Sequence, residues 1–432
     1  MIGLARARQD RAFRLGVANG ILFEIVAVIL QPATVMSAFI LRLTGSTLSA
    51  TVPAALGTIG TLWPQLLASN LAEARPRKQP LYVATSIVRA LSVAAMALAV
   101  SWAGRADTSL LVPLVLLFYF AYTSAAGAGT IAFMDIVGKT VPPPRRGTFW
   151  GLRGFYGGWC ALATGFLVRH MLGPSGPAFP RNFAWLYALA AAVLVVAASA
   201  FAAVPEPVRM PGRPRLPLRR HLARGLAIFR TDRSFRQLYL VGLLSSLATC
   251  GPIVFVPYAI RSLGFSEGIV GTLIVASSVV VLPANFVWSR MSDGGANRRL
   301  YLVSNRLYLA AGVLAVASAL APDGRAVDGL PAGWGLRALC FLPAWVLSAL
   351  AGQSRGMAAT NYMLALAPED QRPSYMAFMS VLQAPMALVP LLAGALAEIV
   401  SFTAVLVLSL TFAVAAHAAI ARLDEVAATP AR

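Results

Sequence analysis

Twelve apolar stretches, each long enough to cross a lipid bilayer as a helix, occupy most of this 432-residue chain. A bilayer core about 30 Å thick needs roughly 20 helical residues to span it. Hydrophobic residues make up 58% of the chain and charged residues 12%, which excludes a water-soluble fold. The apolar residues run continuously instead of alternating, so a membrane β-barrel is excluded as well. The stretches lie near residues 15–41, 50–72, 81–103, 109–137, 147–172, 181–204, 236–262, 267–290, 300–321, 335–366, 374–399 and 402–422.

The basic residues predict how the chain is oriented in the membrane. The formal net charge is +20, and most of the 36 Lys and Arg residues lie before the first stretch, in the even-numbered loops, in a central linker and at the C-terminus. Because positively charged loops remain in the cytoplasm, we expect a multi-pass protein of the cytoplasmic (inner) membrane with both termini in the cytoplasm. Topology and contact with anionic lipid account for the charge, so we expect no nucleic acid partner.

Cysteine and histidine give no indication of a metal site. Cys160, Cys250 and Cys340 each lie within an apolar stretch, so we expect buried, unreactive thiols. The three histidines are scattered along the chain, which leaves too few ligands for zinc. Residues 138–140 resemble the end of a nucleotide-binding loop, but the first glycine of that motif is missing. The sequence therefore predicts no enzyme, no metal site and no cofactor.

A polar segment divides the chain into two halves of six stretches each. Residues 205–235 are rich in Pro and Arg, which predicts a basic cytoplasmic linker between an N-terminal six-helix bundle (1–204) and a C-terminal one (236–432). An internal repeat supports this division, because "DIVGKTVPPPRRGTFWG" after the fourth stretch resembles "NYMLALAPEDQRPSYMA" after the tenth. Duplication of a six-helix unit is the simplest explanation.

In these features the chain resembles the major facilitator superfamily of secondary transporters. The signature of that family between helices 2 and 3 reads approximately G-x-L-A-D-R-x-G-R-R. Here the segment is "SNLAEARPRK", in which Leu71, Ala72, Arg77 and Lys78 match and Glu73 replaces the aspartate. The resemblance implies an all-α polytopic membrane protein with twelve transmembrane helices in two pseudo-symmetric six-helix bundles, related by an axis along the membrane normal.

The resemblance also implies a cytoplasmic gate. In the superfamily the loops after helices 2 and 8 connect one half to the other, and both loops here are acidic first and basic a few residues later. Asp135 ends the fourth stretch and could pair with Arg153 or Arg146. The gate candidates are Glu73, Arg77, Lys78, Asp135, Arg146, Asp293, Arg298, Asn361 and Arg372.

Glu24 carries the most functional information among the residues within the stretches. It lies about nine residues, or ~14 Å, into the first stretch, which is close to the bilayer midplane. A charge there costs about 2.5–3.5 kcal/mol on insertion scales. Glu24 shares one helical face with Gly16, Gly20, Ala27 and Gln31, which predicts contact with a cavity or a helix. It would carry a proton or pair with a cationic substrate, or else pair structurally with an arginine of a neighbouring helix.

Other polar and aromatic residues within the stretches are candidates for a substrate cavity. Arg89 and Arg306 lie nearer the cytoplasmic helix ends, where a long side chain can reach the surface, so they are weaker candidates. Hydrogen bonds between helices explain the glutamines equally well, and aromatic packing explains the tyrosines and Phe255. The cavity candidates are Gln31, Tyr119, Tyr122, Arg153, Phe255, Tyr258, Gln353, Arg355 and Gln383.

Taken together, these patterns predict a monomeric secondary active transporter. It would move a small organic solute across the membrane by alternating access, coupled to protons through Glu24. The alternative is a non-transporting membrane assembly factor or sensor that is built on the transporter fold. The degenerate signature motif favours this alternative, whereas an acid at the midplane on a polar stripe favours transport.

Overall fold

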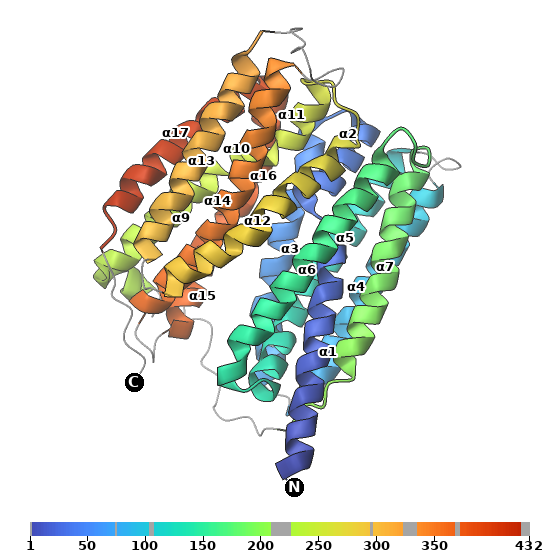
Figure 1. The fold of residues 1–432 in the computed structure, drawn as a ribbon, viewed down its shortest axis with the longest axis vertical. Helices are drawn as coiled ribbons and strands as arrows, with labels where there is room; N and C mark the ends of the chain where they lie inside the picture. The colour runs from blue at the N-terminus through green and yellow to red at the C-terminus, as the bar shows by residue number, and fades with distance from the viewer. Residues whose placement is uncertain are drawn as a thin grey trace. The chain divides into compact units, whose positions relative to one another are not determined.

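Every element assigned in the computed structural model is a helix (Figure 1). The chain forms two compact units, one made of Met1–Arg215 and Phe265–Ser278 and the other of Leu216–Gly264 and Val279–Arg432. The structure describes residues 2–73, 76–102, 108–208, 226–293, 297–322, 335–367 and 372–424.

Long helices form the first unit because its apolar runs contain few residues that interrupt a helix. A proline lacks the backbone N–H that a helix uses, and the helix changes form at one proline of this unit, whereas other prolines lie within continuous helices. At Pro32 the chain leaves the first helix and forms a short π-helical segment. The helix that follows this segment ends at Gly45, whose backbone is left-handed (φ 66°). The elements are α1 (Ile2–Ile29), η1 (Pro32–Met36), α2 (Ser37–Thr44), α3 (Thr47–Glu73), α4 (Gln79–Trp102), α5 (Thr108–Thr140), α6 (Pro143–Leu172) and α7 (Arg181–Ala202).

Two central helices organise the packing of the first unit. Helix α1 packs against both α6 and α7, while α4 packs against both α5 and α7, and α3 covers α5. At one end the core contains Tyr82, Phe149 and Phe201. At the other end Phe39 and Tyr187 meet edge to face, with ring centroids 5.8 Å apart. Two candidate residues of this unit, Glu24 and Arg153, lie along the contact between α1 and α6.

Prolines also interrupt the helices of the second unit. The segment that begins with α9 is capped by Asp232, whose side chain accepts a hydrogen bond from the Phe235 backbone N–H at 3.0 Å. It then breaks into two shorter helices around Pro252. The elements are α9 (Arg233–Ala248), α10 (Cys250–Ile253), α11 (Phe255–Arg261), α12 (Ile269–Asp293), α13 (Asn297–Leu320), α14 (Leu336–Leu366), α15 (Arg372–Gln383), η2 (Ala384–Leu388), α16 (Val389–Ile399) and α17 (Phe402–Ala421).

Helix α13 has the central position in the second unit. It packs against α14 on one side and α17 on the other, and α9 also contacts α17. Phe235, Tyr301 and Tyr362 belong to the largest part of the core described for this unit. Residues 265–278, which precede and begin α12, cluster with the first unit, so α12 is shared between the two units.

The helices confirm a multi-pass membrane protein. Ten segments of the described residues are long and apolar enough to cross a bilayer. Helices α3 and α6, with 27 and 30 residues, are also long enough to cross it, although they are not among these ten. Large apolar side chains such as Leu98, Leu392 and Ile399 are exposed on the helix surfaces, where lipid can cover them.

Candidate functional site

The contact between α1 and α6 brings the predicted Arg153 onto the small residues of α1. The Arg153 guanidinium donates hydrogen bonds to the backbone oxygen of Gly16 at 2.5 Å and to the side-chain oxygen of Asn19 at 3.5 Å. A side chain at Gly20 would collide with Arg153, so this glycine provides the space for the guanidinium. The cation also lies 4.9 Å from the ring centroid of Phe133, a favourable cation–π distance. Arg153 therefore holds α6 to α1.

Glu24 lies on the same interface, further along α1. The bare Cα of Gly157 on α6 faces it, since a Cβ built there would meet the Glu24 Cγ at 2.5 Å. The Glu24 side chain is exposed, and it takes part in none of the ion pairs found among the described residues. Arg153 acts on it only through space. Glu24 is thus a carboxyl group within a membrane helix without a bonded cation in the described part of the chain.

Asn19 is a polar residue of this interface that the sequence analysis missed. It is 2% exposed and donates hydrogen bonds to the Tyr82 hydroxyl at 3.1 Å and the Ala197 backbone oxygen at 2.8 Å. Asn19 thereby connects α1 to α4 and α7. An amide in the middle of an apolar stretch is the signal that could have revealed it, because a buried amide needs partners.

Arg89 differs from its expected position near the surface. Its side chain is 7% exposed and lies 4.1 Å from the ring centroid of Phe23 and 5.1 Å from that of Tyr122. Its guanidinium also donates to the Tyr122 hydroxyl at 3.4 Å. The expectation of a side chain extended to the surface is wrong for Arg89, because two aromatic rings enclose the cation inside the unit. Arg306, in contrast, is exposed.

A buried carboxylate, Glu206, organises the end of the first unit where α4 begins and α5 ends. Its side chain is 1% exposed and accepts hydrogen bonds from the backbone N–H groups of Lys78 at 2.9 Å and Gln79 at 2.8 Å. The Lys139 ammonium lies 2.9 Å from the same carboxylate. A negative charge at a helix N-terminus is favourable, so Glu206 stabilises the start of α4. The sequence analysis assigned Glu206 to the linker and gave it no role.

Asp135 forms an ion pair with neither Arg146 nor Arg153, the two cations that the sequence analysis suggested. Its carboxylate lies 2.5 Å from the Lys139 ammonium, four residues along α5. Arg146 instead donates to the backbone oxygens of Val141 and Gly138, and Arg153 is bound to α1. The i, i+4 spacing within one helix explains this choice, since it places the two side chains on the same face.

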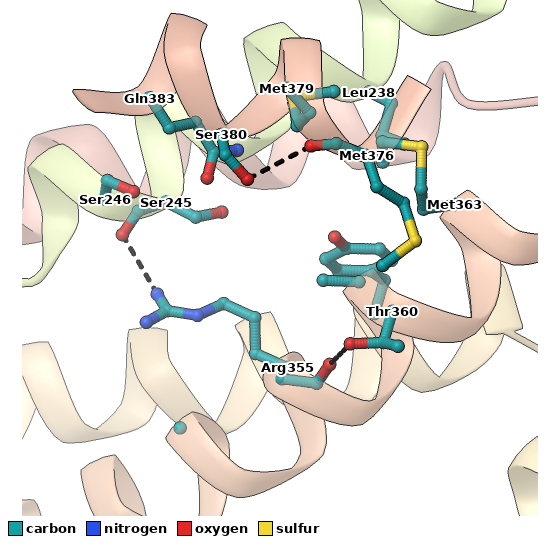
Figure 2. Close-up of a pocket in the computed structure, with 15 residues that line it drawn as sticks. Leu238, Ser245, Ser246, Arg355, Thr360, Met363, Met376, Met379, Ser380 and Gln383 are labelled. Atoms are coloured by element: carbon teal, nitrogen blue, oxygen red, sulfur yellow. Dashed lines mark hydrogen bonds between the residues drawn. The ribbon is translucent and has the colours of Figure 1, made fainter. Parts of the chain in front are cut away.

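A cavity of about 330 Å³ lies within the second unit, between α9, α13, α14 and α15 (Figure 2). Two of the predicted cavity residues, Arg355 and Gln383, line it, and Arg355 is the one ionised side chain among the residues that do. Serines and methionines form much of the remaining wall. Gln353 is exposed and does not line the cavity, although it lies between two residues that do, Gly352 and Arg355.

The Arg355 guanidinium has a fixed position at one side of this cavity. It donates a hydrogen bond to the Ser245 backbone oxygen at 2.9 Å (Figure 2). It also lies 5.7 Å from the ring centroid of Tyr308. Gln383 lies against Gly242 of α9, where a Cβ would meet its amide nitrogen at 2.5 Å. Residues of four helices, α9, α13, α14 and α15, therefore hold the polar side of the cavity in place.

The aromatic candidates lie in the interior of their units. Tyr119 is 2% exposed and its hydroxyl is 3.4 Å from the Leu30 backbone oxygen. Phe255 meets Phe341 edge to face at 5.5 Å. The Tyr258 hydroxyl is 3.0 Å from that of Ser318. Tyr122 contacts Arg89, as described above. These aromatic side chains are therefore part of the packed interior.

The remaining polar candidates are near helix ends or breaks. Gln31 precedes the π-helical segment and accepts a hydrogen bond from the Thr34 hydroxyl at 3.0 Å. Arg298 donates to the Ala421 backbone oxygen at 2.8 Å, which neutralises the C-terminal end of α17. Arg77 is exposed, and Asn361 is partly buried on α14. The side chains of Glu73, Asp293 and Arg372 lie outside the described residues.

Sequence comparison gives distant and uncharacterised relatives. No family model matches the chain. An uncharacterised protein of Mycobacterium tuberculosis is 27% identical over 303 residues, which cover 69% of this chain and 56% of the relative. A counterpart in Mycobacterium bovis gives the same values. The chain therefore spans about half the length of the curated relatives that it matches.

Solved structures of transporters share the fold along almost the whole chain. A D-xylose–proton symporter superposes with a TM-score of 0.68 at 16% identity, covering 97% of this chain and 99% of the symporter. A POT family transporter in complex with 5-aminolevulinic acid gives 0.69 at 11% identity, with 94% of each chain covered. The nucleoside transporter NupG (D323A mutant) gives 0.66 at 12% identity, covering 96% and 99%. The chain has the major facilitator fold that its sequence resemblance implies.

Proposed function

We propose that this protein is a secondary active transporter that moves a small organic solute across the cytoplasmic membrane, coupled to protons. The observation that carries this proposal is Glu24, a carboxyl group within a membrane helix that no described cation binds. A charge buried in a membrane is costly, and such residues commonly mark ion or substrate pathways. The fold, which the compared transporters share, supports the same conclusion.

Glu24 would exchange a proton as the transporter changes its accessible side. The residue faces Gly157 and its side chain is exposed, so its carboxyl group would be open to water or solute. Arg153 lies on the same interface but is occupied by the Gly16 backbone oxygen and the Asn19 amide oxygen. In this proposal the protein is a monomer with both termini in the cytoplasm. The bundles 1–204 and 236–432 move so that the solute site opens to one side of the membrane at a time, and the gate residues control opening to the cytoplasm.

The test is solute uptake by proteoliposomes that contain the full chain. An inward proton gradient is imposed, and uptake is measured for labelled sugars, nucleosides, dipeptides and carboxylates. We expect at least one solute to accumulate against its gradient. Glu24→Gln keeps the side-chain shape but cannot exchange a proton, so we expect accumulation to be lost while exchange of labelled for unlabelled solute continues. Glu267→Gln is the matched control, since Glu267 lies outside the membrane spans.

Two outcomes contradict the proposal. Full pH-driven accumulation by Glu24→Gln would assign the acid a structural role and place proton coupling elsewhere. A wild-type protein that moves none of the solutes, with or without a gradient, would favour the alternative function of a membrane assembly factor or sensor.

A further inference from the structure

We infer that the cavity of the second unit binds the carboxylate group of an organic anion that has a compact apolar body. The inference rests on the proposed transport function, for which it names the substrate class. It is carried by Arg355 and Ser245 at one side of the cavity and by three methionines at the other (Figure 2).

The charge of the cavity favours an anion. Arg355 is the one ionised residue among those that line the cavity, and it belongs to none of the ion pairs in the described part of the chain. A guanidinium has five N–H donors, and one hydrogen bond to the protein is found here, to the Ser245 backbone oxygen. The other donors are available to a ligand. A carboxylate matches such a donor group in both charge and geometry.

Ser245 supplies a second donor beside the guanidinium. Its side chain is 5% exposed, lines the cavity, and has no hydrogen-bond partner for its hydroxyl oxygen in the described structure. Two other wall hydroxyls are already committed, because Thr360 and Ser380 donate to the backbone oxygens of Gly356 and Met376, each at 3.0 Å. A buried polar atom without a partner is unfavourable, so the free Ser245 hydroxyl points to a ligand atom. The two oxygens of one carboxylate would bind Ser245 and Arg355.

The opposite side of the cavity is apolar. Leu238, Met363, Met376 and Met379 lie there, away from Arg355 (Figure 2). Methionine side chains are flexible and polarisable, so they adapt to apolar groups of differing shape. A volume of about 330 Å³ accommodates about ten non-hydrogen atoms, if each takes roughly the 30 Å³ of a water molecule. The cavity thus fits a small amphipathic carboxylate better than a cation or a sugar.

Ligand binding to the purified full-length protein tests this inference. The probes are hexanoate and 4-phenylbutyrate, each compared with the amide and the amine of the same carbon skeleton. Binding is measured by the rise in thermal unfolding temperature with ligand concentration. We expect a saturable rise with the carboxylates, and affinities at least tenfold lower for the amides and amines, because these lose the charge-assisted hydrogen bonds.

Two variants assign the binding to the cavity. Arg355→Gln is expected to weaken carboxylate binding by roughly tenfold or more, and Ser245→Ala by severalfold. Arg306→Gln is the matched control, because Arg306 is an exposed arginine of the same unit that does not line the cavity. If Arg355→Gln does not fold, Ser245→Ala and the ligand series on the wild-type protein still decide the question.

The outcomes separate this inference from the transport proposal. Carboxylates that bind through Arg355, in a protein that transports none of the tested solutes, would leave the site standing and contradict the transport function. Transport of another solute by a protein that binds neither carboxylate would overturn the site while leaving transport intact. Equal affinity for carboxylate and amide, or equal weakening by Arg306→Gln, would also overturn the inference.

Discussion

Glu206→Ala is expected to destabilise the first unit strongly. The Glu206 carboxylate accepts hydrogen bonds from the backbone N–H groups of Lys78 and Gln79 and neutralises Lys139, while its side chain is only 1% exposed. Alanine would remove all of these contacts at once. It would leave two backbone donors at the start of α4 and one ammonium without this partner, in a place that water reaches poorly.

The expected magnitude follows from the burial of these groups. Each buried donor that loses its partner costs about 1–3 kcal/mol, and breaking a buried ion pair costs about 3–5 kcal/mol. Asp135 retains part of the Lys139 interaction at 2.5 Å, which limits the loss. We therefore expect Glu206→Ala to lower the free energy of unfolding by about 3–5 kcal/mol. For a unit of this size that corresponds to a fall in unfolding temperature of about 6–20 °C.

Thermal unfolding of the detergent-purified protein measures this effect, and Asp135→Ala is the matched control. Asp135 binds the same lysine, but its side chain is 37% exposed, so its ion pair contributes about 1 kcal/mol or less. We expect its unfolding temperature to fall by less than about 4 °C. Glu206→Gln should lie between the two alanine variants, because an amide oxygen still accepts a hydrogen bond but does not neutralise Lys139.

Equal shifts for Glu206→Ala and Asp135→Ala would refute this reasoning. They would show that water or another side chain replaces the buried carboxylate. A fall of less than about 4 °C for Glu206→Ala would have the same meaning.

Two further predictions concern the other polar contacts. The Tyr375 hydroxyl donates to Asp232 at 2.8 Å, and burial together with this carboxylate raises the pKa of Tyr375 to about 12. The neutral phenol therefore contributes stability below pH 10, and this stability is lost as the pH rises from about 10 to 12. Tyr375→Phe should lower the free energy of unfolding by about 1 kcal/mol at neutral pH. It should also reduce the loss of stability that unfolding measurements show at alkaline pH. A pH dependence unchanged in Tyr375→Phe would contradict this. If the proposed transport function is right, charge reversal of Glu73 or Asp293 should bias the protein toward an inward-facing state. Unchanged labelling of cytoplasmic-side cysteine probes in both variants would argue against the gate.

The sequence determined the class of fold because the bilayer imposes a simple rule. Every backbone polar group in hydrocarbon must be satisfied within the helix itself, so long apolar runs can only be membrane helices. Run lengths were therefore enough to predict a multi-pass helical membrane protein, and the resemblance to the major facilitator superfamily implied its fold, which the compared structures share. Glu24 could be singled out in the same way, since an acid in such a run is costly.

Partners across helices could not be read from the sequence. Arg153 was one of the two cations that the sequence suggested for Asp135, but in the structure it donates to Gly16 and Asn19 of another helix, α1. Arg89 illustrates the same limit, because the rings of Phe23 and Tyr122 that enclose it come from two other helices. Which side chains meet depends on helix rotation and packing, and no local pattern encodes these.

The tertiary structure alone decided which polar residues work together. Sequence reasoning identified Arg355 and Gln383 one by one, but the cavity requires Ser245 from α9 and methionines from α14 and α15 at one place. Glu206 was hidden in a polar segment where a carboxylate is ordinary, and it matters because folding buries it against the start of α4. Composition and periodicity are properties of one segment and determined the helices, whereas burial and pairing are properties of several segments and arose only from their packing.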